Sequence, residues 1–156
     1  MNVNITLAEP ADIPALAGLL AMLFEQEYDF NPDRTRQERA IALLLQEPEH
    51  AWIWVARADS VPVGMISLQS VISTAEGGKS LWLEDWIVHP ACRGRGIGGR
   101  LLRYAIEQAR ARGFRRISLL TDRDNLSAQG RYAEQGFKPS AMLPMRLLLP
   151  EDPTKM

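Results

Sequence analysis

The stretch from Val88 to Leu102 limits the folds open to this chain more than any other, and it reads V-H-P-A-C-R-G-R-G-I-G-G-R-L-L. It follows an apolar run that starts at Leu81 and it precedes an amphipathic run, so it predicts a strand, a glycine-rich turn and the start of a helix. Glycines let the backbone take positive φ and come close to a ligand. The free amides and the positive end of the helix dipole then face an anion. The pattern therefore predicts a phosphate or pyrophosphate held mainly by main chain.

Two other phosphate loops differ from this one. A Walker loop ends in Gly-Lys-Ser or Gly-Lys-Thr, whereas this turn ends in Gly-Gly-Arg at 98–100. The dinucleotide pattern G-x-G-x-x-G matches 94–99, but it begins far down the chain and follows a block that looks antiparallel. A glycine-rich connector with solvated arginines is the remaining alternative, and the gathering of the glycines at a strand-to-helix junction argues against it.

The fuller pattern R-x-x-G-x-G at 93–98, with V-x-P before it and L-L after it, resembles the acyl-CoA pyrophosphate loop of the GNAT N-acetyltransferase superfamily. The resemblance implies acetyl-CoA as the acyl donor. It places cofactor contacts at Ile87, Val88, Arg93, Gly94, Arg95, Gly96, Ile97, Gly98, Gly99 and Asn125.

A second segment, N-x-x-A…Y…G-F at 125–137, resembles the same family. The resemblance implies that Asn125 hydrogen-bonds the cofactor and that Tyr132 is the general acid for the departing thiolate. Asn125 is also expected to cap the helix that follows it. Gln129, Gly130, Arg131 and Gln135 depart from the usual small or apolar residues of that helix. The alternative role for Tyr132 is that of an ordinary core tyrosine.

A third segment, L-E-D-W-I-V at 83–88, looks like that of diamine acetyltransferases. Two adjacent carboxylates in an apolar strand need an explanation, because burying unpaired charge is costly. Strict alternation puts Glu84 on the face of Trp82, Trp86 and Val88, and Asp85 on the face of Leu83 and Ile87. We expect Glu84 to be the base, directly or through water. We expect acceptor contacts from Asp85, Tyr28 and Glu25. A salt bridge for Asp85, an exposed edge position for Glu84, and a surface or core role for the others are the alternatives.

The hydrophobic pattern predicts a mixed α/β (α+β) fold along the whole chain. Helices are expected at 13–24, 36–45, 98–112 and 126–135, and strands at 3–8, 51–58, 61–72, 81–88, 116–121, 137–139 and 142–149. The turn Asp59-Ser60 is expected to join the strands at 51–58 and 61–72. The order resembles the GNAT fold, which implies a sheet of about seven strands, splayed between the strand before the glycine loop and its parallel neighbour. We expect one domain over 1–150 and a short tail at 151–156.

The charges are uneven along the chain. Residues 1–52 carry nine acidic and three basic side chains, whereas 93–146 carry four acidic and twelve basic ones. This distribution of charge suits an anionic ligand near the second half of the chain and a cationic ligand near the first half. Few aromatics lie among the arginines, so no nucleic-acid partner is expected. One cysteine and two distant histidines predict neither a disulfide nor a metal site. The absence of a signal or membrane segment predicts a cytoplasmic protein without a membrane partner.

The sequence therefore predicts an acetyl-CoA-dependent N-acetyltransferase that moves the acetyl group to a primary amine by direct attack. Two alternatives stay open: transfer to a protein or peptide, and a GNAT-fold module that binds CoA without turnover. The predicted strand at 142–149 either pairs between protomers of a homodimer or closes the chain's own sheet.

Overall fold

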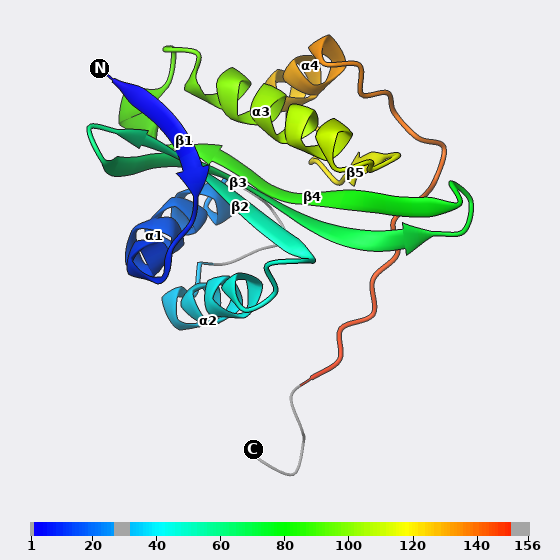
Figure 1. The fold of residues 1–156 in the computed structure, drawn as a ribbon, viewed down its shortest axis with the longest axis horizontal. Helices are drawn as coiled ribbons and strands as arrows, with labels where there is room; N and C mark the ends of the chain where they lie inside the picture. Colours follow the sequence, from blue (N-terminus) through cyan, green and yellow to red (C-terminus); the bar gives the residue numbers. More distant parts are fainter. Residues whose placement is uncertain (1, 27–31, 151–156) are drawn as a thin grey trace.

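A mixed sheet runs through the middle of the molecule between two layers of helices, as the computed structural model shows for residues 2–26 and 32–150 (Figure 1). Helices α1 and α2 cover one face and α3 and α4 lie over the other. The elements are β1 Val3–Leu7, η1 Pro10–Asp12, α1 Ile13–Phe24, α2 Arg34–Leu45, β2 Ala51–Ala58, β3 Val61–Ser73, β4 Gly78–Val88, η2 Pro90–Cys92, α3 Ile97–Ala111, β5 Ile117–Leu119 and α4 Leu126–Glu134.

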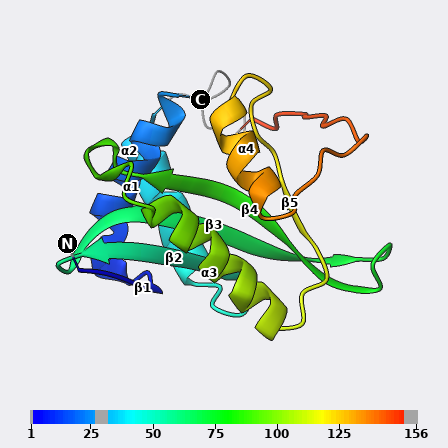
Figure 2. The ribbon, with the colours of Figure 1, turned by 90° about the horizontal axis from the view of Figure 1, so that it is seen from above.

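The sheet order is β1-β2-β3-β4-β5, with the first four strands antiparallel. The β2–β3 hairpin turns at Asp59 and Ser60, whose φ values of 50° and 72° match the two-residue turns that suit a twisted hairpin. Helix α3 crosses over between β4 and β5, which makes that pair parallel. Seen from above, α3 lies across the strands that it covers (Figure 2).

The sheet opens between its last two strands. β5 pairs with β4 only from Leu81↔Ile117 to Leu83↔Leu119, while β4 runs on to Val88. Within 2–26 and 32–150, no strand lies beside 84–88 on this edge. The predicted splay and the mixed α/β class are therefore confirmed.

The predicted strands at 137–139 and 142–149 are wrong. The structure gives these residues no strand, so the described sheet has five strands rather than about seven. Pro144 removes one backbone donor, and large side chains such as Met145 and Leu147 stay 90% and 83% exposed. An apolar segment forms a strand only where its backbone can pair with the edge of a sheet. Within residues 2–26 and 32–150, this segment pairs with no strand.

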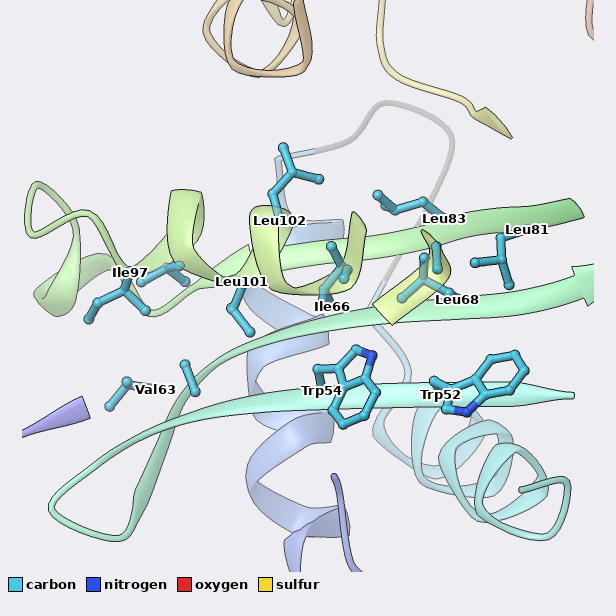
Figure 3. Packing of buried hydrophobic residues seen from close by; sticks show 14 of the residues in the cluster. Trp52, Trp54, Val63, Ile66, Leu68, Leu81, Leu83, Ile97, Leu101 and Leu102 are labelled. Atoms are coloured by element: carbon cyan, nitrogen blue, oxygen red, sulfur yellow. The ribbon is translucent and has the colours of Figure 1, made fainter. Parts of the chain in front are cut away.

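Two buried clusters fill the space between the layers. The first joins β2, β3 and β4 to α3, and Figure 3 shows its side chains meeting between the sheet and that helix. Edge-on aromatic pairs add to it, with ring centroids 5.5 Å apart for Trp52 and Phe114 and 5.0 Å apart for Trp54 and Tyr104. The second cluster joins the opposite face to α1 and α2.

A β-bulge interrupts β4 at Glu84. Asp85 pairs with Ser67 and Leu83 pairs with Leu68, so Glu84 is the extra residue. The strict alternation predicted for this strand is therefore wrong at Leu83, which is buried on the α3 face together with Val88. Asp85 pairs with Ser67, which alternates with Ile66 of the α3 face, so Asp85 belongs to the opposite face, as predicted.

A largely buried ion pair ties β2 to the turn after β1. Arg57 donates from both terminal nitrogens to the carboxylate of Asp12, at 2.7 and 2.6 Å, and from Nε to Thr6 Oγ1 at 2.8 Å. The Glu9 amide also donates to Asp12, at 2.7 Å. The side chains of Asp12 and Arg57 are only 10% and 15% exposed. The hydrogen bonds from Arg57 lower the pKa of the Asp12 carboxyl, although burial opposes them.

Replacing Gly130 with alanine is expected to stabilise the protein by about 1 kcal/mol. Gly130 lies inside α4, and an added Cβ would meet no heavy atom within 4 Å, so only the higher helix propensity of alanine remains. Urea unfolding measures the change. The matched control is Gly136→Ala, which is expected to destabilise, because Gly136 has φ of +99°. Destabilisation by Gly130→Ala would contradict this account.

Candidate active site

The glycine loop forms the strand-to-helix junction that the sequence predicts. Gly94 and Gly96 have φ of 78° and 77°, and Gly96 is the N-cap residue, directly before α3. The Arg100 amide donates to the Gly96 carbonyl at 3.1 Å, which is the first hydrogen bond of the helix. The amides of 97–99 lie before it and have no carbonyl of the preceding turn to donate to. These amides, Arg95 and the positive end of a 15-residue helix suit a phosphate group.

The strand end and the loop are tied together by side chains. Nε of Arg93 donates to the Val88 carbonyl at 3.2 Å, and Nδ1 of His89 accepts from the Ala91 amide at 3.1 Å. The Arg93 guanidinium thus braces the end of β4 in addition to adding positive charge. Ile87 and Val88 are buried at this end of the strand, beside the open edge.

The start of α3 lies directly against β4 at Gly98. Nε1 of Trp86 donates to the Gly98 carbonyl at 3.0 Å. A Cβ on Gly98 would lie 3.4 Å from both the Trp86 ring and a Val88 methyl. A larger side chain would therefore move the helix start, with its free amides, away from the strand.

Replacing Gly98 with valine is expected to weaken CoA binding at least 10-fold, which corresponds to about 1.4 kcal/mol. Isothermal titration calorimetry with CoA measures the change. Gly18→Val is the matched control, because Gly18 also lies inside a helix and has open space around it. Equal affinities of the two variants would show that the helix start does not hold the phosphates.

Tyr132 lies where the sheet opens. It is 8% exposed, and its ring centroid lies 5.1 Å from that of Trp86 and 5.5 Å from that of Phe137. Helix α4 thus brings Tyr132 onto the part of β4 that β5 does not cover. The packing restrains the ring, although Gly130 lies two residues before it in the helix.

Arg131 is a residue of this region that sequence reasoning set aside as a departure from the family pattern. Its guanidinium carbon lies 6.0 Å from the Trp86 ring centroid. One terminal nitrogen lies 3.6 Å from the place that a Cβ on Gly98 would take. A helical cation therefore adds to the positive charge at the start of α3.

Asn125 begins α4, as predicted. Its Oδ1 accepts from the Ala128 amide at 3.1 Å, which caps the helix and leaves the side-chain amide N–H groups for a ligand. Nε2 of Gln129 donates to the carbonyls of Asp122 and Arg123, both at 2.9 Å. The glutamine thereby fixes the loop that presents Asn125.

The two adjacent carboxylates occupy different surroundings. Glu84, the bulged residue, is exposed. Asp85 is partly buried and accepts a hydrogen bond of 2.8 Å from Oγ of Ser67, a residue that is 1% exposed. Burial and, to a smaller extent, the nearby charge of Glu84 raise the pKa of the Asp85 carboxyl to about 6, although the Ser67 hydrogen bond acts in the opposite direction. The partner of Asp85 is thus a serine rather than an arginine, and sequence reasoning missed it.

The predicted acceptor residues are not gathered at one place by the described chain. Glu25 is exposed at the end of α1, and Tyr28 lies outside the described residues. Across 2–26 and 32–150, no three histidine, cysteine or carboxylate side chains lie together as metal ligands would. The helices of the same ranges include none with the length and apolar character needed to cross a membrane.

Known proteins resemble this chain in sequence and in fold. The chain is 28% identical over 137 residues to an uncharacterized N-acetyltransferase, YhfO, of Bacillus subtilis, with 86% of this chain and 89% of that protein covered. It is 29% identical over 133 residues to the aminoalkylphosphonate N-acetyltransferase of Salmonella typhimurium, with 85% and 83% covered. A predicted acetyltransferase from Clostridium acetobutylicum, solved with acetyl-CoA, has the same fold, with a TM-score of 0.77, 18% identity and 93% and 96% of the chains covered.

A family model, that of the acetyltransferase (GNAT) family, matches residues 16–137. The match includes the bulged strand, the glycine loop and Tyr132, which the fold brings together at the opening of the sheet. The chain therefore belongs to the GNAT family of acetyltransferases, which take the acyl group from acetyl-CoA.

Proposed function

We propose that this acetyltransferase moves the acetyl group to the primary amine of a small molecule by direct attack. The observation that carries the proposal is the placement of Tyr132 against Trp86, at the open edge of a strand that also carries Glu84 and Asp85 and leads into the glycine loop. The amine nitrogen bonds to the thioester carbonyl carbon, the carbon–sulfur bond breaks, and no covalent enzyme intermediate forms.

The donor binds along the open edge of β4 in this proposal. The amides at the start of α3, together with Arg95 and Arg131, hold the pyrophosphate. Asn125 donates from its side-chain amide, and the backbone at Ile87 and Val88 faces the pantetheine. The thioester then lies near Tyr132, whose hydroxyl gives a proton to the departing thiolate. A backbone N–H of the strand stabilises the oxyanion of the tetrahedral intermediate.

The acceptor must lose a proton before it attacks, because an alkylammonium group has a pKa near 10.4. Glu84 takes this proton through water, and its exposure at the bulge supports that role. Asp85 lies on the face opposite α3, and in its ionised form it attracts the ammonium group of the acceptor. The acidic first third of the chain adds to the attraction.

A small acceptor is favoured by the Salmonella relative, whose name specifies an aminoalkylphosphonate as substrate and of which this chain covers 83%. The deciding experiment is thiol release from acetyl-CoA with separate panels of small amines, amino acids and peptides, beside calorimetric binding of CoA. Turnover with small amines supports the proposal. Turnover with peptides alone would establish a peptide acetyltransferase instead, and CoA binding without turnover in any panel would favour the non-catalytic module.

A further inference from the structure

Helix α3 begins with positive charge that no acidic residue of its own first turn offsets. Its first turn holds no carboxylate, and its first two turns carry Arg100 and Arg103. A cation near the amino-terminal end of a helix is unfavourable, because the helix dipole is positive there. Arg100 has a structural role, since its Nη2 donates to the Val3 carbonyl at 3.1 Å. Among the described residues, the Arg103 guanidinium has no hydrogen bond or ion pair, so its position needs another explanation.

The Arg103 side chain turns back along the helix to Gly99. A Cβ on Gly99 would lie 3.1 Å from one terminal nitrogen of Arg103 and 3.8 Å from its guanidinium carbon. The two residues are four positions apart, and helical side chains point toward the amino terminus, so Arg103 covers the surface one turn before it. Because glycine has no side chain, the guanidinium lies over the backbone of the first turn. The exposed Arg103 therefore presents its charge beside the amides of 97–99.

A second guanidinium lies on the adjacent side of the same turn. One terminal nitrogen of Arg131 lies 3.6 Å from the place that a Cβ on Gly98 would take, and the Trp86 ring lies 3.4 Å from that place. Successive residues of a helix point about 100° apart, so Arg131 and Arg103 flank the start of α3 from two sides. Arg131 also has no ion pair in the described part of the chain. Two such guanidinium groups beside the helix amides suit more than one phosphate group.

Coenzyme A carries phosphate at two places. A pyrophosphate lies in the middle of the molecule, between pantetheine and adenosine, and a phosphate monoester is attached to the 3′ position of the ribose. Near neutral pH a phosphate monoester carries a charge of about −1.5 to −2. In the donor position proposed above, the pantetheine leads toward Tyr132, on the side of Gly98 and Arg131. The adenosine leaves the pyrophosphate at its other end, which faces the exposed side where Arg103 lies.

We propose that Arg103 binds the 3′-phosphate of acetyl-CoA, so that the enzyme distinguishes CoA from dephospho-CoA, which lacks this group. The inference rests on the donor position proposed above. Arg131 binds the pyrophosphate, which both molecules carry. A guanidinium pairs with phosphate oxygens through two parallel N–H···O bonds, and such charged contacts are stronger than neutral hydrogen bonds. The two arginines therefore have separate roles, which a comparison of the two ligands distinguishes.

Calorimetric titration of the full chain with CoA and with dephospho-CoA tests the assignment. The wild-type protein is expected to bind CoA at least about 10-fold more tightly than dephospho-CoA. Arg103→Gln is expected to lower this ratio below about 3, because it weakens the binding of CoA alone. Arg131→Gln is expected to weaken the binding of both ligands by the same factor and to keep the ratio.

Arg110→Gln is the matched control. Arg110 is also an exposed arginine of α3, and it lies seven residues beyond Arg103, which is about two turns along the same face. It lies in the last turn, away from the glycine loop. The control is expected to bind CoA and dephospho-CoA with wild-type affinities.

Urea unfolding without ligand separates binding from a structural role. The midpoint for Arg103→Gln is expected to be at least as high as that of the wild type, because the change removes a cation beside the positive end of the helix. A lowered midpoint with an equal loss of both affinities would overturn the assignment and show a structural arginine. Equal wild-type affinities for the two ligands would also overturn it. The proposed position of the pyrophosphate fails separately, if Gly98→Val binds CoA as tightly as the wild type does.

Discussion

Replacing Asp85 with asparagine is expected to lower kcat/KM for the amine at least 10-fold near neutral pH and to remove the acidic limb of its pH profile, because a hydrogen bond between charged groups contributes about 1.5–3 kcal/mol. The pKa of about 6 means that wild-type Asp85 is ionised above that pH and neutral below it. If the ionised carboxylate attracts the ammonium group, wild-type kcat/KM falls as the pH drops through about 6. Asparagine does not titrate, so the variant is slow throughout this range without that limb. Initial rates of thiol release across the range measure the effect.

Three variants separate this role from damage to the fold. Ser67→Ala removes the hydrogen bond that favours the ionised form, so the acidic limb is expected to move to higher pH. Glu84→Gln is expected to lower kcat and to move the limb to lower pH, because it removes a charge that raises the pKa of Asp85. Tyr132→Phe is expected to lower kcat by about 100-fold and to keep the limb. An unchanged limb in Asp85→Asn would refute the proposed role of Asp85.

Replacing Asp12 with asparagine is expected to destabilise the protein by about 3 kcal/mol, the lower end of the range for breaking a buried ion pair. Arg57 would keep its charge in a site where it is only 15% exposed. The pKa of Asp12 is lowered in the folded state, so its contribution is fully present above the unfolded value near 3.8 and is lost as the pH falls through the folded value. The difference in the free energy of unfolding between wild type and variant is therefore largest above about pH 4 and becomes smaller at lower pH.

Urea unfolding at a series of pH values measures this difference. Glu38→Gln is the control, because Glu38 also pairs with an arginine, Arg34, at 3.2 Å, but the two side chains are 39% and 62% exposed. The loss of stability in Glu38→Gln is expected to stay below about 0.5 kcal/mol. A similar cost for both variants would show that the burial of the Asp12 pair adds nothing.

Local patterns predicted most of the elements correctly because each depends on neighbours in sequence. The four helices, the hairpin turn at Asp59 and the parallel crossover after the glycine loop follow from periodicity and turn chemistry. The last two strands could not be predicted in this way, because a strand needs a partner edge and apolar composition does not provide one. Only the arrangement of the whole sheet decides whether residues 142–149 meet such an edge.

The candidate site was predictable where the family pattern is contiguous and was missed where contacts are distant. The loop and the capping role of Asn125 follow from motifs. The hydrogen bond between Ser67 and Asp85 joins residues 18 positions apart, and the bulge sets their register, so no spacing rule finds it. Arg131 differs from the family pattern, and only the packing of α4 against the start of α3 shows what it contacts.

The bulge at Glu84 makes β4 one residue longer than the part of β3 that it pairs with, and it does not change which neighbouring side chains enter the core. If Glu84 were deleted, Leu83 and Asp85 would become neighbours opposite Leu68 and Ser67, which are neighbours already. The ladder would then be regular, and the side chains on either side would keep their faces. Glu84 is thus an extra residue relative to the two-residue repeat of the strand, so a chain lacking it could keep the fold while losing the bulge and the exposed carboxylate beside the open edge.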